Sequence, residues 1–130
     1  MYQIGEVTKR LNMSADTLRY YENIHLLPPV SRNTSGLRIY CDKDLSRLKF
    51  IKRAQRMGFS LEEIGQLLTF REAPQKAKPE VSLLAKEKLS DIERHLQELQ
   101  TLRNELQLLV NLCTGSKDGC PIIEGLDDGD

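Results

Sequence analysis

The segment from Pro79 to about Leu112 constrains the fold of this chain more than any other part of it. Its apolar side chains recur every three or four residues, with one slip, which is the pattern of a helix with a single apolar stripe. The stripe comprises residues 85, 89, 92, 96, 99, 102, 106 and 109. At 1.5 Å per residue this helix would extend roughly 50 Å, so alone it has nothing against which to bury the stripe. The segment therefore predicts a coiled-coil dimerisation helix; the alternative is a long helix that folds back on its own domain.

Composition supports association of two copies. The chain has 130 residues, only 5% of which are aromatic, and it contains no tryptophan. A core built from one copy is expected to be small, and a dimer would supply the missing burial. No apolar run approaches the roughly 18 residues of a membrane span, and the first residues lack the apolar stretch of a signal peptide. We therefore expect a cytoplasmic protein with no membrane segment.

Charge is divided unevenly along the chain. Residues 1–71 hold 12 Lys and Arg against 7 Asp and Glu, whereas residues 72–130 hold 7 against 12. A basic front half next to an acidic rear half indicates that the front half meets a polyanion. The alternative is ordinary scatter of charge over two solvated surfaces.

The first 25 residues read as two short helices joined by a turn. Ile4, Val7 and Leu11 have helical spacing, Asn12 interrupts the pattern, and Ser14 is a natural N-cap for a second helix. Two compact helices joined by about three residues are the outline of a helix-turn-helix, although many small domains contain such a pair.

A hairpin and two further helices are expected next. Prolines at 28 and 29 end the second helix, and the turn sequence "NTSG" separates "PVSR" from "LRIY", so Arg32 and Arg38 lie on opposite arms. Helical periodicity returns at positions 45, 48, 51 and 54 and ends near Gly58. Ser60 and Glu63 then form a capping box at the start of another helix.

Three segments, taken together, resemble a known family. "TLRYYE", "SRNTSGLRIY" and "DLSRLKFIKRAQRMGFSLEEIGQLL", in this order and spacing, closely resemble the winged-helix domain of the MerR family of transcription regulators. The ending "CTGSKDGCPIIEGL" looks most like the copper-efflux regulators of its metal-sensing branch. The resemblance implies a mainly α fold. A winged helix-turn-helix DNA-binding domain (1–71) would precede a linker and antiparallel coiled-coil dimerisation helix (72–112), then a metal-binding loop, short helix and acidic tail (113–130).

The resemblance also implies a function. Members of the family are homodimers that grip a palindrome in double-stranded promoter DNA, between promoter elements set unusually far apart. On binding an effector they distort the DNA, so that RNA polymerase engages both elements. The implied protein is a ligand-gated activator and not an enzyme.

Carried onto this chain, the resemblance predicts a set of DNA contacts. Arg19 and Tyr20 would lie on the recognition helix with Thr17 near its start, Arg38 would contact DNA from the wing, and Arg32 and Arg53 would add backbone contacts. Tyr21 fits the core as well as it fits a contact. The family often carries tyrosine in the wing where this chain has Leu37, so an aromatic contact there is not expected.

Cys113 and Cys120 stand at the two ends of a loop, with six residues between them, and this arrangement raises four possibilities. A structural disulfide is disfavoured in a reducing cytosol. Structural zinc needs four ligands, which only a site shared across a dimer would supply. A redox switch needs only two facing thiols. A soft-metal clamp is favoured, because Cys120 precedes Pro121 at an expected helix N-terminus, where thiolate is stabilised and selects ions such as Cu(I), Ag(I) or Au(I).

Lys78 bears on which metal is bound. The family's divalent sensors carry a third cysteine at the start of the dimerisation helix, and here the corresponding residue is Lys78. An ammonium cannot ligate while it is protonated, but from the partner chain it would stabilise the negative charge of two thiolates around a monovalent ion. This difference predicts selectivity for Cu(I), Ag(I) or Au(I) over Zn(II), Cd(II) and Pb(II). The alternative is a sensor of a divalent ion, Zn(II), Cd(II), Pb(II) or Hg(II).

The remaining candidate side chains give less evidence about function. Cys41, at the start of the helix after the hairpin, is expected to be structural, and His25 and His95 have no ligand partners nearby in the sequence. A thiol-based redox or electrophile sensor on the same scaffold is the second candidate function. A thiol oxidoreductase is the third, and it is disfavoured because the chain has no CxxC motif.

Overall fold

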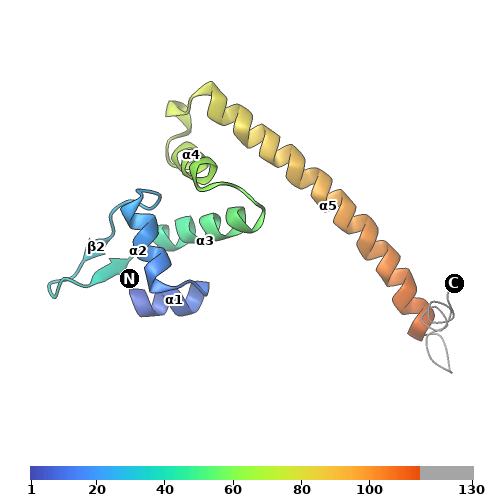
Figure 1. Cartoon of the computed structure of the whole chain (residues 1–130), viewed down its shortest axis with the longest axis horizontal. Coiled ribbons are helices and arrows are strands. Elements are labelled where there is room, and N and C mark those ends of the chain that lie inside the picture. Colours follow the sequence, from blue (N-terminus) through green and yellow to red (C-terminus); the bar gives the residue numbers. More distant parts are fainter. Residues whose placement is uncertain (115–130) are drawn as a thin grey trace. The chain divides into compact units, whose positions relative to one another are not determined.

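The computed structural model describes residues 1–114 (Figure 1). It divides into one compact unit, Met1–Leu84, and a second unit that begins at Ala85. The elements, in chain order, are β1 (Tyr2–Gln3), α1 (Ile4–Leu11), α2 (Ala15–Asn23), β2 (Ser31–Arg32), β3 (Arg38–Tyr40), α3 (Asp42–Arg56), α4 (Leu61–Glu72), the 3₁₀ turn η1 (Pro74–Lys76) and α5 (Pro79–Thr114). The fold is mainly helical with one small antiparallel sheet, as predicted.

Polar caps define the helix-turn-helix. Asn12 ends α1 in the left-handed conformation, with φ of 53°. The Ser14 hydroxyl then accepts a hydrogen bond from the Thr17 backbone N–H at 3.1 Å, which satisfies a donor that α2 would otherwise leave unpaired. The predicted interruption and the predicted cap are both confirmed.

The hairpin is the wing of the domain. β2 pairs with β3 in antiparallel register, which places Arg32 and Arg38 on opposite arms as predicted. The register sets the two arginines directly opposite each other. The Asn33 side chain accepts hydrogen bonds from the Ser35 and Leu37 backbone N–H groups, both at 3.0 Å, and Gly36 takes φ of 81°. β3 also pairs with β1, so the sheet has the order β1-β3-β2. β1 was not predicted from the sequence.

One apolar core holds Met1–Leu84 together. α3 presents the predicted face, residues 45, 48, 51 and 54, to this core, and all four are buried. Tyr21 is buried as well, and its hydroxyl donates to Gln55 Oε1 at 2.6 Å, so of its two predicted roles it takes the structural one. The contact joins the buried Tyr21 of α2 to Gln55 of α3, which is exposed.

An ion-pair network ties the end of α4 to α3. Arg47 donates from Nη1 to Asp44 Oδ1 at 3.1 Å and from Nε to Glu72 Oε1 at 2.8 Å, and its side chain is largely buried. Lys43 adds a second contact to Glu72 at 3.3 Å. The hydrogen bond from Arg47 lowers the pKa of Glu72 to about 2. Since Glu72 is the last residue of α4, the network fixes the position of the segment that leads toward α5.

α5 is a single helix of 36 residues, beginning at Pro79 as predicted and ending at Thr114, two residues later than predicted. None of its residues is buried. The leucines of the predicted stripe are exposed, among them Leu96, Leu99, Leu102 and Leu106. No helix in the described part of the chain is long and apolar enough to cross a membrane.

Candidate DNA-binding surface and sensor residues

α2 divides its residues between two faces. Leu18 and Tyr21 are buried in the core, whereas Arg19 and Tyr20 lie on the opposite side of the helix, with Tyr20 51% exposed. The two exposed side chains combine a guanidinium with an aromatic hydroxyl, and both reach phosphate oxygens and base edges in protein–DNA complexes. α2 therefore has the outward face expected of a recognition helix.

The contacts that Arg19 and Thr17 make within the chain differ in strength. Arg19 contacts the Asp16 carboxylate at 3.1 Å, but Asp16 is 95% exposed, so water screens the pair and a DNA phosphate would replace it at little cost. Thr17 Oγ1 lies 2.7 Å from Ser14 Oγ, and its backbone N–H donates to the same oxygen. Thr17 thus takes part in the cap, which orients the start of α2.

The two wing arginines occupy different environments. Arg32 is exposed and its Nη1 donates to the Gly36 carbonyl at 2.8 Å. Arg38 is mostly buried and its Nε donates to Glu22 Oε1 at 2.9 Å, while Glu22 Oε2 accepts from the Val30 backbone N–H at 3.0 Å. Arg38 therefore joins the wing to α2, and Arg32 is the wing arginine that remains open to a ligand.

The Glu22 carboxylate organises this junction. Burial alone would raise the pKa of Glu22, but the hydrogen bonds from Val30 and Arg38 outweigh it and lower the pKa below its usual value. This role of Glu22 was not predicted from the sequence. In the sequence, Glu22 is only an acidic residue at the end of a predicted helix with basic residues farther along the chain, and this pattern is too common to be informative.

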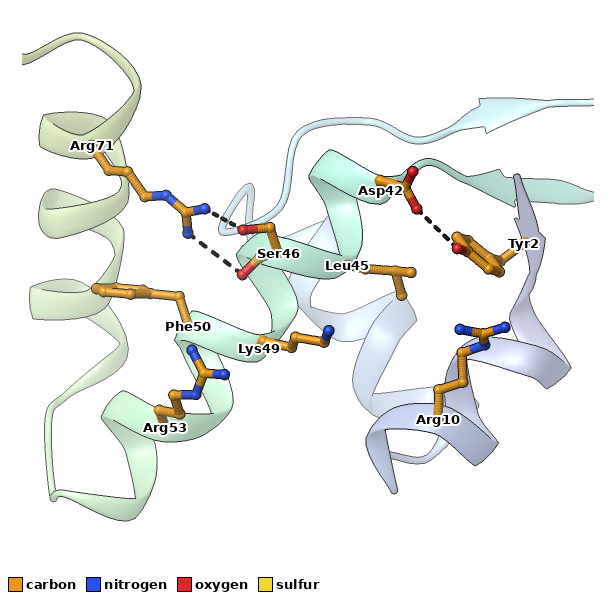
Figure 2. A pocket seen from close by; sticks show the side chains of 9 residues that line it. All are labelled: Tyr2, Arg10, Asp42, Leu45, Ser46, Lys49, Phe50, Arg53 and Arg71. Atoms are coloured by element: carbon orange, nitrogen blue, oxygen red, sulfur yellow. Dashed lines mark hydrogen bonds between the residues drawn. The ribbon is translucent and has the colours of Figure 1, made fainter.

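Arg53 is separated from the other predicted contacts. It lies on α3 and lines a pocket between α1, α3 and α4, together with Lys49, Phe50 and Arg71 (Figure 2). The structure thus brings Thr17, Arg19 and Tyr20 together on α2 and leaves Arg53 on a different surface.

The residues predicted to sense the metal are Lys78, which precedes α5, Cys113 in its last turn, and Cys120 farther along the sequence. Cys113 is half-buried in the last turn of α5 and is disulfide-bonded. The other predicted ligand, Cys120, lies outside the described residues. Lys78 is exposed and immediately precedes α5. Within residues 1–114 no group of three or more His, Cys, Asp or Glu side chains could hold a metal ion.

Cys41 has a local structural role. As the N-cap of α3, its thiol contacts Asp44 Oδ2 at 3.3 Å, and its backbone N–H donates to the same oxygen at 3.1 Å. Cys41 is a free cysteine. These contacts agree with the structural role expected from the sequence.

Two family models match nearly the whole described chain. The model described as MerR HTH family regulatory protein matches residues 2–70, and the model described as MerR, DNA binding matches residues 45–109. The chain belongs to the MerR family. Its members are transcriptional regulators and not enzymes, so the winged helix-turn-helix described above is the DNA-binding part of such a regulator.

Curated MerR-family relatives match over almost their full length. An uncharacterised HTH-type transcriptional regulator of Pseudomonas aeruginosa, PA4778, is 42% identical, covering 97% of this chain and 96% of the relative. The regulator ZntR of Escherichia coli K12 is 38% identical, covering 99% and 94%. The regulator CueR of Escherichia coli O157:H7 is also 38% identical, covering 95% and 92%.

Two solved structures of MerR-family regulators are similar to this chain. The transcription regulator PbrR691 from Ralstonia metallidurans CH34, in complex with lead(II), is 33% identical with a TM-score of 0.59, covering 97% of this chain and 99% of that one. HiNmlR, a MerR-family regulator that lacks a sensor domain, is bound to promoter DNA; it is 25% identical with a TM-score of 0.66, covering 85% and 84%.

Proposed function

We propose that this protein is a metal-responsive transcription activator that binds promoter DNA as a homodimer in the cytoplasm and senses a soft monovalent ion through Cys113 and Cys120. The observation that carries this proposal is the pairing of a family-typical recognition helix with a cysteine in the last turn of α5. Metal binding at the cysteines would distort the bound promoter, so that RNA polymerase engages both of its elements.

DNA binding is assigned mainly to α2. Arg19 and Tyr20 point away from the core and would contact phosphates or base edges in the major groove, with Thr17 ordering the start of the helix. Arg32 would contact the DNA backbone from the wing, and Arg38 would hold the wing against α2 through Glu22. A backbone contact by Arg53 stays a prediction, since it lies on another surface. The complex of HiNmlR with promoter DNA supports this use of the fold.

A homodimer is inferred from α5. Among residues 1–114, fifteen large hydrophobic side chains are exposed in the single chain, and ten of them lie between Leu83 and Leu112 on this helix. A second copy with the same stripe is a complementary partner, because identical apolar seams interdigitate in a coiled coil. The antiparallel direction would bring the cysteine-bearing end of one helix near Lys78 of the other.

The assignment to a monovalent ion rests on charge. Two thiolates around one monovalent ion have a net charge of about −1, which a Lys78 ammonium nearby would stabilise, whereas near a divalent ion the same ammonium adds repulsion. Lys78 is exposed and makes no ion pair with the described residues, so it is available for this role. The lead(II) complex of PbrR691 makes a divalent effector the alternative.

Promoter induction by individual ions tests the proposal. Copper, silver and gold should induce transcription strongly, and zinc, cadmium, mercury and lead weakly. Lys78→Cys should raise the response to the divalent ions by completing a three-sulfur site. Strong induction of the wild type by zinc or lead, with none by copper, silver or gold, would show that the effector is divalent.

Cysteine variants test the sensor itself. Cys113→Ser and Cys120→Ser should abolish metal induction and leave operator affinity nearly unchanged, because the recognition helix and the wing lie in the other unit of the chain. Cys41→Ser is the matched control and should respond normally, since serine is also a good N-cap. A full response to copper in either sensor variant would refute the clamp.

A thiol-based redox sensor is the second candidate function. It is favoured by the disulfide at Cys113, because a bonded pair of sulfurs is the oxidised state that a redox switch requires. Induction by a thiol oxidant such as diamide, in the presence of a copper chelator, would support the redox sensor. Induction by Cu(I) under anaerobic, reducing conditions would support the metal clamp instead.

A further inference from the structure

A pocket of about 560 Å³ lies in the unit Met1–Leu84, bounded by β1, α1, α3 and α4 (Figure 2). Four cationic side chains line it: Arg10 from α1, Lys49 and Arg53 from α3, and Arg71 from α4. Asp42 is the one acidic residue among the lining side chains. The pocket therefore has an excess of three positive charges and a volume in the usual range for small-molecule sites.

The pocket lies on the far side of α3 from the recognition helix. α2 contacts α3 through Gln55, which bonds Tyr21 in the core. With about 100° of rotation per residue, Arg53 lies about 160° around the α3 axis from Gln55, and Ser46 about 180°. Arg19 and Tyr20 face away from the core on the other side of α2. The core thus separates the pocket from the surface assigned to DNA.

The pocket cations are not neutralised within the described chain. Elsewhere in the same unit, arginines at 19, 38 and 47 each pair with a carboxylate. None of the four pocket cations forms an ion pair with a carboxylate in the part of the chain that the structure describes, and no hydrogen bond engages Lys49 or Arg53 there. Uncompensated positive charge gathered in a concavity attracts an anion.

Two of the guanidinium groups are already held in place. Arg10 stacks over the Tyr2 ring at 4.6 Å, and the Tyr2 hydroxyl donates to Asp42 Oδ1 at 2.9 Å, which occupies one oxygen of the single acid. Arg71 lies 5.9 Å from the Phe50 ring centroid and donates to Ser46 through both Nη atoms (Figure 2). Side chains fixed in this way lose less conformational entropy when a ligand binds.

We propose that this pocket binds a phosphorylated small molecule through its phosphate groups. Guanidinium forks match the geometry of phosphate oxygens and Lys49 adds a point charge, so a diphosphate or triphosphate group would engage several cations at once. The gathering of four cations around one pocket favours a compact polyanionic ligand over an extended acidic protein segment, and its position behind the recognition helix separates it from operator DNA. A ligand that bridged Arg10 and Arg71 would also link α1 to the last turn of α4, next to the network around Glu72.

Isothermal titration calorimetry on the full chain at low ionic strength tests this site. Inorganic pyrophosphate and ATP should both bind, and adenosine, which lacks phosphate, should not. Tighter binding of ATP than of pyrophosphate would assign part of the affinity to the nucleoside. Lys49→Gln should weaken both by about tenfold, the effect of losing one charge-assisted hydrogen bond.

Lys76→Gln is the matched control, because it removes one exposed lysine of the same unit outside the pocket. It should leave pyrophosphate binding unchanged, and Lys49→Gln should retain wild-type operator affinity. The proposal is overturned if neither phosphate compound binds, or if both variants weaken binding equally, which would indicate diffuse charge attraction. It is also overturned if Lys49→Gln loses operator affinity, or if only an oligo-aspartate peptide binds, which would make the pocket part of a DNA or a protein interface.

Discussion

Leucines in the two units of this chain meet opposite environments. Leu48 in α3 is 0% exposed, enclosed by side chains from several helices of Met1–Leu84. Leu96 in α5 is 58% exposed, and no residue of that helix is buried. The first unit contains its own core, whereas α5 in the second presents an apolar stripe that no other part of the described chain buries.

This difference separates two kinds of stability. Burying a leucine is worth about 2 kcal/mol, and in the first unit one chain obtains that energy on folding. In α5 the same energy becomes available only when a second apolar surface covers the stripe, so it depends on protein concentration. We therefore expect the first unit to determine the fold and α5 to determine the assembly.

The largest expected effect comes from a charge in the α5 stripe. Leu96→Asp or Leu99→Asp would bury an unpaired carboxylate in an apolar seam, at a cost of several kcal/mol per helix pair. Sedimentation should show monomers, with operator affinity greatly reduced. Gln97→Asp, one residue away but off the stripe, should remain dimeric. Dimers in both leucine variants would show that another surface joins the copies.

A core truncation in the first unit should have the next largest effect. Leu48→Ala would remove about 2–5 kcal/mol from the free energy of unfolding, because it leaves a cavity among well-packed neighbours. Chemical denaturation followed by circular dichroism would measure it. The loss should be the same at low and high protein concentration, unlike that of the α5 variants. A loss that shrank at high concentration would mean that the first unit also depends on its partner for folding.

Removing the α3–α4 ion pair should have the smallest effect on the free energy of unfolding, and this effect should depend on pH. Its partial exposure limits Arg47–Glu72 to about 1 kcal/mol, so Glu72→Gln should lower the free energy of unfolding by that amount at pH 7. The pKa of Glu72 is about 2 in the folded state, below the usual value of 4.5, so the carboxylate is favoured by folding. Its contribution is complete above about pH 4.5 and is lost as the pH falls toward 2.

Denaturation curves of wild type and Glu72→Gln between pH 2 and pH 7 would measure this dependence. The two curves should converge at low pH. Glu62→Gln, which removes an acid of the same helix outside the network, should show no comparable trend. A constant difference between wild type and Glu72→Gln at every pH would assign the effect to packing and not to charge.

Some features of the fold could be predicted because they depend on neighbours in sequence. The Ser14 cap, the Ser60–Glu63 capping box and the start of α5 at Pro79 each involve residues at most four apart. The hairpin followed from the turn sequence between its two arms. The buried face of α3 followed from the periodicity of its leucines.

Other features depend on residues far apart in sequence. β1 is two residues long and exists because β3, nearly 40 residues later, provides its hydrogen-bonding partners. The pairing of Glu22 with Arg38 gives a predicted DNA-contacting arginine a role in positioning the wing. Neither relation has a signature in a short window of sequence.

The sequence by itself therefore determined the helices and the wing, because capping, turn chemistry and periodicity act over a few neighbouring positions. The family and the thiol residues proposed as the sensor came from the resemblance of sequence motifs, which needs no fold. Only the tertiary structure decided which arginines are open to a ligand and which are used internally. It placed Arg19 and Tyr20 on the outward face of α2, buried Arg38 against Glu22, and set Arg53 in a basic pocket behind the core. The physical reason is that an arginine is open to a ligand only where the folded chain places no largely buried carboxylate beside it. That placement depends on residues far apart in the sequence.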